Sequence, residues 1–347
     1  MTAGMEASAS TRPARPAWAG RVARLAFGLL LIPLVAWATA ALYFDCRIAW
    51  LRLPLAVGFP LAILGLALGV RRRWAALGLA FGAWAAVLAW WLSLAPSNQR
   101  DWRPDVAVLP RAEIDGDRIT LHNVRYCRYR TDTDYDVRHE DRTYDLRRLR
   151  SVDLFLVYWG SPWIGHTMVS FGFDDGQYLC VSIETRMERG EAYSALRGFF
   201  RQFELTYVIA DERDVVRLRT NFRQGEEVHL YRLVGRPDKA RQFLLDYLRH
   251  ANALSEAPEW YNAATSNCTT NIRVHSEAAA EREHPFDWRI LFNGRIDELL
   301  AQHHAFASPL PAAALKQAGH INARARAAGD AADFSRRIRE GIPGIAP

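Results

Sequence analysis

The sequence lacks the paired cysteines that mark zinc ribbons and thioredoxin-type redox sites. Its four cysteines stand far apart along the chain, and none belongs to a CxxC pair: Cys46, Cys127, Cys180 and Cys268. In an oxidising compartment Cys127 and Cys180 could form a disulfide, but the sequence leaves this open. The chain also has no visible internal repeat, so a repeat architecture is not indicated. We expect neither a metal nor a cofactor.

The soluble part of the chain also lacks an excess of basic residues. The net charge is +6, but residues 1–73 carry nine arginines against Glu6 and Asp45, a local charge of +7. The rest of the chain is therefore close to neutral, at −1. A protein that binds nucleic acid needs a basic surface, so this class of function is excluded.

Charged residues are absent from three long stretches near the N-terminus: Leu25–Phe44, Leu53–Val70 and Trp74–Ala95. An α-helix rises 1.5 Å per residue, so about twenty apolar residues cross a hydrocarbon core of roughly 30 Å. The prolines and glycines of the second stretch are tolerated in membrane helices. Three such runs in succession are hard to bury in the core of a soluble protein. We therefore predict a membrane domain of residues 1–96 with three transmembrane helices.

The arginines around these stretches predict the orientation of the chain in the membrane. Four arginines precede the first stretch and Arg71–Arg73 lie between the second and third, whereas the intervening loop holds only Arg47 and Arg52. By the positive-inside rule, the N-terminus and Arg71–Arg73 are cytoplasmic. The chain after about Pro96 is then periplasmic, on a multi-pass protein of a bacterial inner membrane. Cleavage of the first stretch as a signal peptide near residues 38–40 is an alternative that leaves this location unchanged.

From residue 97 the pattern predicts an α+β domain that ends near residue 304, followed by a peripheral C-terminal tail of residues 305–347. Most of the strand-like stretches come before the helical ones. They are mostly joined as hairpins, which predicts a mainly antiparallel sheet. The predicted strands are Val152–Trp159, Gly165–Phe173, Tyr178–Arg186, Glu204–Ala210, Val215–Thr220 and Val228–Val234. The predicted helices are Ala192–Gln202, Pro237–His250 and a third from Cys268 to about Ala280.

Cys268 is the candidate nucleophile. Ser266 or Asn267 can cap the helix that follows, which places the Cys268 thiol at the N-terminus of that helix. Unpaired N–H groups and the helix dipole stabilise an anion there and lower the pKa of a thiol. The same N–H groups could form an oxyanion hole. The alternative is a buried cysteine that acts as a small apolar side chain.

His166 is the candidate base, and side-chain parity pairs it with Glu184. The apolar residues of two neighbouring strands must meet one core, so His166 and Glu184 share the opposite face. A three-residue loop, Asp174–Gly176, with glycine in the left-handed third position sets a register that places Glu184 directly across from His166, with Cβ atoms about 5 Å apart. Glu184 would then orient the imidazole as the third member of a triad. The alternative is a histidine satisfied at the margin of the sheet.

The residues just before Cys268 are candidates for binding substrate. Tyr261 and Asn262 lie close enough in the chain to line a pocket at Cys268, together with Asn267, although they could instead cap the loop. A second polar cluster, Asp211–Asp214, is interpreted as a charged turn between strands rather than a metal or acid–base site.

Six short motifs together resemble the periplasmic domain of the Lnb-type lipoprotein N-acyltransferases. In chain order they are Trp102-Arg103-Pro104-Asp105, Tyr144-Asp145-Leu146, His166 with Ser170-Phe171-Gly172-Phe173, Ser182-Ile183-Glu184-Thr185-Arg186, Glu204-Leu205-Thr206-Tyr207, and Tyr261-Asn262 with Asn267-Cys268-Thr269-Thr270. The match spans about residues 98–280. The sequence also has a histidine on a predicted strand and, much later in the chain, an Asn-Cys pair at the start of a predicted helix. This order is similar to the permuted papain-like fold of lecithin:retinol acyltransferase and relatives of the NlpC peptidases.

The resemblance implies thioester chemistry on Cys268 with His166 as the base. For the Lnb type it implies transfer of an acyl chain from a phospholipid to the amino group of a lipoprotein's N-terminal cysteine. The alternative function is a papain-like cysteine hydrolase that cuts peptidoglycan amides or lipid esters, because water can replace the amine as the acceptor. A binding module in which Cys268 is inert is a third hypothesis.

Overall fold

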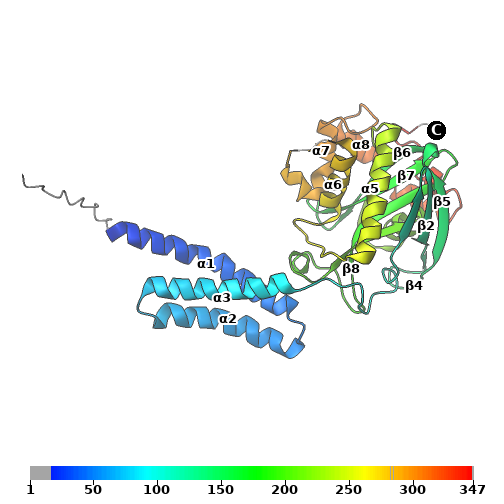
Figure 1. Cartoon of the computed structure of the whole chain (residues 1–347). Helices are drawn as coiled ribbons and strands as arrows, with labels where there is room; N and C mark the ends of the chain where they lie inside the picture. The colour runs from blue at the N-terminus through cyan, green and yellow to red at the C-terminus, as the bar shows by residue number, and fades with distance from the viewer. Residues whose placement is uncertain (1–16, 282, 284, 346–347) are drawn as a thin grey trace, which may run out of the picture. The chain divides into compact units, whose positions relative to one another are not determined.

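The computed structural model describes residues 17–281, 283 and 285–345, and it divides the chain into two compact units, Met1–Ala95 and Pro96–Pro347 (Figure 1). The boundary lies one residue from the position expected from the sequence. Arg12 and Arg15, which contributed to the predicted orientation, lie outside the described residues.

The N-terminal unit consists of three apolar helices: α1 (Ala17–Asp45), α2 (Ala49–Gly69) and α3 (Arg73–Ser93). The segments long and apolar enough to cross a membrane are Ala26–Asp45, Ala49–Gly69 and Arg73–Ser93, of 20, 21 and 21 residues. The indole N–H of Trp91 on α3 donates to Asp45 at the end of α1 at 2.7 Å. Most side chains in these spans are not buried within the unit, as expected for helices that lipid surrounds. The three predicted membrane helices are confirmed.

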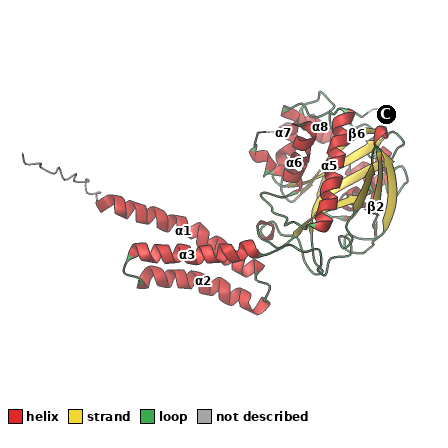
Figure 2. Cartoon of the chain, viewed as in Figure 1, coloured by secondary structure: helices red, strands yellow, loops and turns green. Residues whose placement is uncertain are grey.

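The C-terminal unit is built on a mainly antiparallel sheet (Figure 2). Its strands are β1 (Arg111–Asp115), β2 (Arg118–Arg125), β5 (His139–Asp145), β6 (Leu149–Trp159), β7 (Gly165–Phe173), β8 (Tyr178–Arg186), β9 (Glu204–Ala210) and β10 (Glu226–Arg232). The order is β1-β2-β9-β8-β7-β6-β10, with β5 also paired to β2, and β2 runs parallel to β9. A separate small sheet pairs β3 (Arg128–Tyr129) with β4 (Tyr135–Asp136).

Helices cover both faces of this sheet. On one face, α5 (Pro237–Glu256) and α6 (Cys268–Ala280) share a core with residues such as Phe171 and Tyr207. On the other face, a second core includes residues of α4 (Glu212–Arg217), α9 (Asn322–Ala328) and α10 (Phe334–Arg337). The helices α7 (Ile296–Gln302) and α8 (Ala312–Gly319) complete the unit. The predicted α+β class is confirmed.

The expectation of a peripheral tail after residue 304 is wrong. Ile321, Phe334 and Ile338 have no exposed surface and pack into the second core. Arg339 is buried as well, and its guanidinium forms ion pairs with Glu212 at 2.6 Å and with Asp153 on β6 at 2.9 Å. A buried charge requires such partners because removal from water is costly. The C-terminal residues therefore belong to the fold of the domain.

Two predicted elements have a different structure. Val215–Thr220, expected as a strand, lies in α4 and in the turn of π-helix that follows, Leu218–Phe222. Asp211 starts α4 because its carboxylate accepts from the Arg213 N–H at 2.9 Å, an N-cap that outweighs the β propensity of the valines. Ala192–Gln202, expected as a helix, contains only a short helical turn, Arg197–Phe199.

The acidic cluster at residues 211–214 is not a solvated turn. Glu212 and Asp214 are fully buried. Glu212 pairs with Arg339, and Asp214 accepts two hydrogen bonds from the Arg125 guanidinium, at 2.8 and 2.9 Å. These carboxylates fix α4 to the sheet, so their role is structural.

Candidate active site

Cys268 is the first residue of α6, and Asn267 is the N-cap, one of the two residues expected there. The Asn267 side chain accepts from the Thr270 N–H at 3.0 Å, and the Thr270 hydroxyl accepts from the Asn267 N–H at 2.8 Å. This reciprocal capping box fixes the start of the helix. Cys268, a residue only 5% exposed, therefore lies in the first helical turn, at the positive end of the dipole.

The predicted register between β7 and β8 is confirmed. Met168 pairs with Ser182 and Phe171 with Leu179, and the Phe173 N–H donates to the Gln177 carbonyl across a three-residue loop. Gly176 closes that loop with a φ of +83°, in the left-handed region that glycine adopts without strain. Continuing the register towards the start of β7 places His166 across from Glu184.

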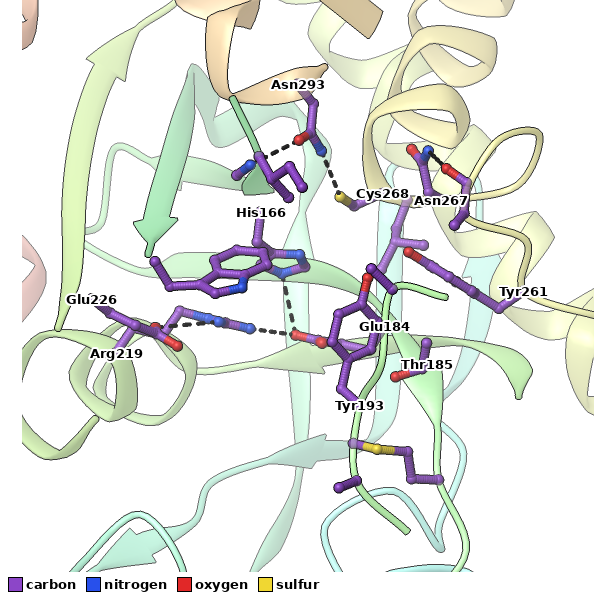
Figure 3. A pocket seen from close by; sticks show the side chains of 18 of the residues that line it. His166, Glu184, Thr185, Tyr193, Arg219, Glu226, Tyr261, Asn267, Cys268 and Asn293 are labelled. Carbon is purple, nitrogen blue, oxygen red and sulfur yellow. Dashed lines mark hydrogen bonds and ion pairs between the residues drawn. The ribbon is translucent and has the colours of Figure 1, made fainter. Parts of the chain in front are cut away.

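The side chains of His166, Ser182 and Glu184 form a short hydrogen-bonded chain. Figure 3 shows the direct contact between His166 and Glu184. The Ser182 hydroxyl donates to Glu184 Oε1 at 2.6 Å and lies 2.7 Å from His166 Nε2. Nε2 also lies 3.2 Å from Glu184 Oε1. Because the hydroxyl proton goes to the carboxylate, Ser182 accepts from the imidazole, and His166 carries a proton on Nε2. Nδ1 is then the ring nitrogen left for the thiol of Cys268.

The electrostatics of this cluster favour a thiolate beside an imidazolium. Burial alone would raise the pKa of Cys268, but the charge of His166 and hydrogen bonds from His166 and Thr167 lower it to about 6. Burial alone would lower the pKa of His166, but the charge of Glu184 raises it to about 9. The thiol is thus ionised above about pH 6 and the imidazole is protonated below about pH 9.

Arg219 is a member of the site that the sequence did not indicate. Its guanidinium, 6% exposed, donates to Glu184 Oε1 at 2.8 Å and approaches Glu226 on β10 at 3.4 Å. Burial would raise the pKa of Glu184, but the charges of His166 and Arg219 hold it well below its usual range. Glu184 therefore stays charged between two cations. Arg219 lies in the stretch that was expected to form a strand and is instead helical, and that change of structure brings its side chain to Glu184.

Asn293 is the second residue that the sequence did not indicate. Its Nδ2 lies 3.7 Å from the Cys268 sulfur and donates to the Thr269 hydroxyl at 2.9 Å, while its Oδ1 accepts from the Gly165 N–H at 2.8 Å. The neighbouring Gly294 allows this approach, since a Cβ there would come within 2.5 Å of the Pro162 carbonyl. Asn293 thus connects the nucleophile to the first residue of β7, from a position 25 residues further along the chain.

A cavity of about 860 Å³ opens in front of Cys268, His166 and Glu184. Tyr261 and Asn267 line it, as predicted, whereas Asn262 does not. The Asn262 side chain instead accepts from the N–H groups of Ala264 and Thr265, at 2.9 and 3.1 Å, and so caps its own loop. Apolar side chains form much of the wall: Trp159, Ile164, Ile183, Met187, Ala192, Tyr193, Ala195, Phe199, Leu291 and Phe292. The volume is in the range of small-molecule sites.

Removing the charge of Glu184 should lower the reactivity of Cys268 and His166 but leave their arrangement in place. For the thioester chemistry that the sequence predicts, we expect Glu184→Gln to lower the rate of Cys268 acylation about tenfold, because it keeps a hydrogen-bond acceptor but no longer favours the imidazolium. The pKa of His166 should fall, so the alkaline limit of the pH–rate profile should move to lower pH. A matched control is Glu140→Gln on β5, which pairs with Arg142 at 2.9 Å and does not line the cavity. An unchanged profile in Glu184→Gln would contradict the orienting role.

The family model described as Lnb N-terminal periplasmic domain matches residues 135–294. The match includes His166, Glu184, Cys268 and Asn293, and it confirms the resemblance to the Lnb family. No curated protein and no solved structure matches the chain. The chain thus has three apolar helices and, after them, a region that is similar to the Lnb N-terminal periplasmic domain, which supports a membrane protein with a periplasmic domain.

Proposed function

We propose that this Lnb-type protein is a thiol acyltransferase that moves an acyl chain from a phospholipid, through a thioester on Cys268, to the N-terminal amine of a lipoprotein. The observation that supports it most directly is the arrangement of Cys268, His166 and Glu184 on a largely apolar cavity. The membrane helices add to this, because both the donor and the acceptor of such a reaction reside in a bilayer.

The first half-reaction forms the thioester. The Cys268 thiolate attacks the ester carbonyl of the phospholipid, and the carbonyl oxygen becomes an anion. The N–H groups at the start of α6 and the Nδ2 donor of Asn293 are the candidates to stabilise that anion, since both lie beside the sulfur. As the intermediate collapses, the C–O bond breaks and His166 gives its Nδ1 proton to the departing lysophospholipid oxygen.

The second half-reaction transfers the chain to the amine. The neutral His166 takes a proton from the attacking amino group, a C–N bond forms, and the C–S bond breaks to release the Cys268 thiolate. The thiolate and imidazolium are then restored. Glu184, held by Ser182 and Arg219, stabilises the imidazolium at the start and the end of the cycle.

The proposal places the domain on the periplasmic side of a bacterial inner membrane. The orientation follows from the arginine asymmetry, with Arg71–Arg73 in the cytoplasm and Ser93 at the outer end of α3. Phospholipid in the outer leaflet and lipoproteins anchored there would both be within reach of the domain.

The acceptor decides between a transferase and a hydrolase, and mass spectrometry of lipoprotein N-termini tests it. In cells that lack other N-acylating enzymes, we expect lipoproteins to carry an N-acyl chain when this protein is present and a free amine when it is absent. A free amine in both cases, with free fatty acid released from phospholipid, would instead support the hydrolase. Cells that express the Cys268→Ala variant serve as the control for effects of expression.

A further inference from the structure

The mouth of the cavity is surrounded by apolar side chains that face solvent. Five residues line the cavity and are each between 42% and 50% exposed: Ile164, Tyr193, Phe199, Leu291 and Phe292. A residue that meets both conditions lies where the cavity opens. We call this set the apolar rim. It comes from three separate segments: the loop before β7, the connection from β8 to β9, and the segment around Trp288–Arg295.

Two exposed tryptophans, Trp163 and Trp288, lie next to the apolar rim. Trp163 lies 6.4 Å from Phe292 and 6.1 Å from Trp288, measured between ring centroids, and both indoles are 47% exposed. Arginines stack on them: Arg295 lies 5.1 Å from the Trp163 ring and Arg289 lies 6.0 Å from the Trp288 ring. Exposed aromatic rings with cations among them are typical of protein surfaces at the boundary between lipid and water.

We propose that the apolar rim, with Trp163 and Trp288, docks on the surface of a phospholipid bilayer. The inference rests on the proposed function, since it names the surface from which the acyl chain would enter. Seven exposed apolar side chains gathered at one cavity mouth are unfavourable in water and favourable in the interfacial layer of a membrane. An acyl chain could then pass from the bilayer to Cys268 along the cavity wall without crossing water.

The chain itself favours a bilayer over a protein as the partner of this surface. The last apolar helix ends at Ser93, and the Ser97 N–H already donates to Glu204 on β9 at 3.1 Å. Four residues span at most about 14 Å, so the domain is attached close to the end of a membrane helix. A short tether keeps the local concentration of lipid high, so a shallow docking surface is sufficient.

Depth measurements on the full-length protein in phospholipid vesicles test the docking. In a Cys268→Ala background, a nitroxide is attached to Leu291→Cys or to the control Val234→Cys, since Cys46, Cys127 and Cys180 are buried. Val234 is 62% exposed and apolar, and it lies just beyond the Arg232 end of β10. Glu226, which lines the cavity, is at the other end of that strand, about 20 Å away along its length. We expect the label at 291 to meet oxygen dissolved in lipid and the label at 234 to meet a water-soluble nickel chelate. Equal exposure of both labels to the nickel chelate would overturn the docking.

A kinetic comparison separates this proposal from the proposed function. Trp163 and Trp288 do not line the cavity, so the double variant Trp163→Ser/Trp288→Ser keeps the wall intact. We expect it to form the Cys268 thioester about tenfold more slowly from long-chain phospholipid in vesicles, because two partly exposed rings no longer enter the interface. From a short-chain phospholipid dissolved as monomers, the rate should be unchanged.

Each outcome has a separate meaning. An equal loss with both donors would overturn the docking role and place the two tryptophans in the reaction itself. If the native protein forms no thioester from either donor, the proposed function fails, while the label depths still decide whether the apolar rim docks. Unfolding temperatures of the double variant and the native protein, compared in the same detergent, check that the variant is folded.

Discussion

Replacing Cys268 by alanine is expected to abolish the thioester and to lower acyl transfer by at least a thousandfold. The sulfur is the atom that would carry the chain, and alanine leaves the helix cap formed by Asn267 and Thr270 intact. The measurement is the intact mass of the protein after incubation with phospholipid, followed by neutral hydroxylamine, which cleaves thioesters. An acyl group labile to hydroxylamine on Cys268→Ala would contradict the mechanism.

His166→Ala should lose most of the activity too, because a neutral buried thiol is a weak nucleophile. The double variant should be little worse than either single one, since members of one catalytic unit are not additive. Cys180→Ala is the matched control: Cys180 is also a buried cysteine, but it pairs with Ala210 inside the sheet and does not line the cavity. Strictly additive losses in the double variant would show that Cys268 and His166 act separately.

The part of the site that lies in adjacent strands was predictable from the sequence. Alternation along β7 and β8 separates core residues from polar ones, and the glycine at the third loop position fixes the register. These two local facts are sufficient to place Glu184 beside His166. The position of Cys268 at a helix start was predictable for a similar reason, since an asparagine directly before it can cap the helix.

Contacts between segments far apart in the chain were not predictable. Arg219 reaches Glu184 from a π-helical turn, and Asn293 reaches the sulfur from a short helical segment after α6. Nothing in the local pattern of either segment reports its distant partner. The same holds for Arg339, which lies in a stretch with Arg336, Arg337 and Glu340, although its ion pairs with Glu212 and Asp153 lie in the core. Tertiary pairing of buried charges overrides what a polar stretch suggests.

The other two cysteines of the C-terminal unit, Cys127 and Cys180, should not compete with Cys268 in reactions of thiols. The disulfide between Cys127 and Cys180 that the sequence left open is absent from the described residues, where both thiols are free and buried. Burial and the charge of Asp214 raise the pKa of Cys127 to about 12, and burial and the charge of Glu212 raise the pKa of Cys180 well above its ordinary value. Neither thiol should therefore react near neutral pH, which leaves Cys268 as the reactive thiol among the soluble unit's described cysteines.

The pH dependence of alkylation should distinguish the thiolate–imidazolium pair from an ordinary thiol. With a pKa of about 6, Cys268 is mostly ionised at pH 7, so its rate of reaction with iodoacetamide should rise around pH 6 and then level off. In His166→Ala the favourable charge is gone and burial remains, which should return the pKa to its ordinary value of 9.0 or above. The ionised fraction at pH 7, and with it the rate, should then fall about a hundredfold.

Acyl transfer should follow a different profile, because it needs the imidazolium as well as the thiolate. Its rate should rise through about pH 6, as Cys268 loses its proton, and decline through about pH 9, as His166 does. Alkylation has no need for the imidazolium proton, so it should not decline at high pH. The two profiles are measured on one preparation of the full-length protein. If alkylation of the native protein rises only near pH 9, as in His166→Ala, the two side chains do not form an ion pair and His166 is not the base.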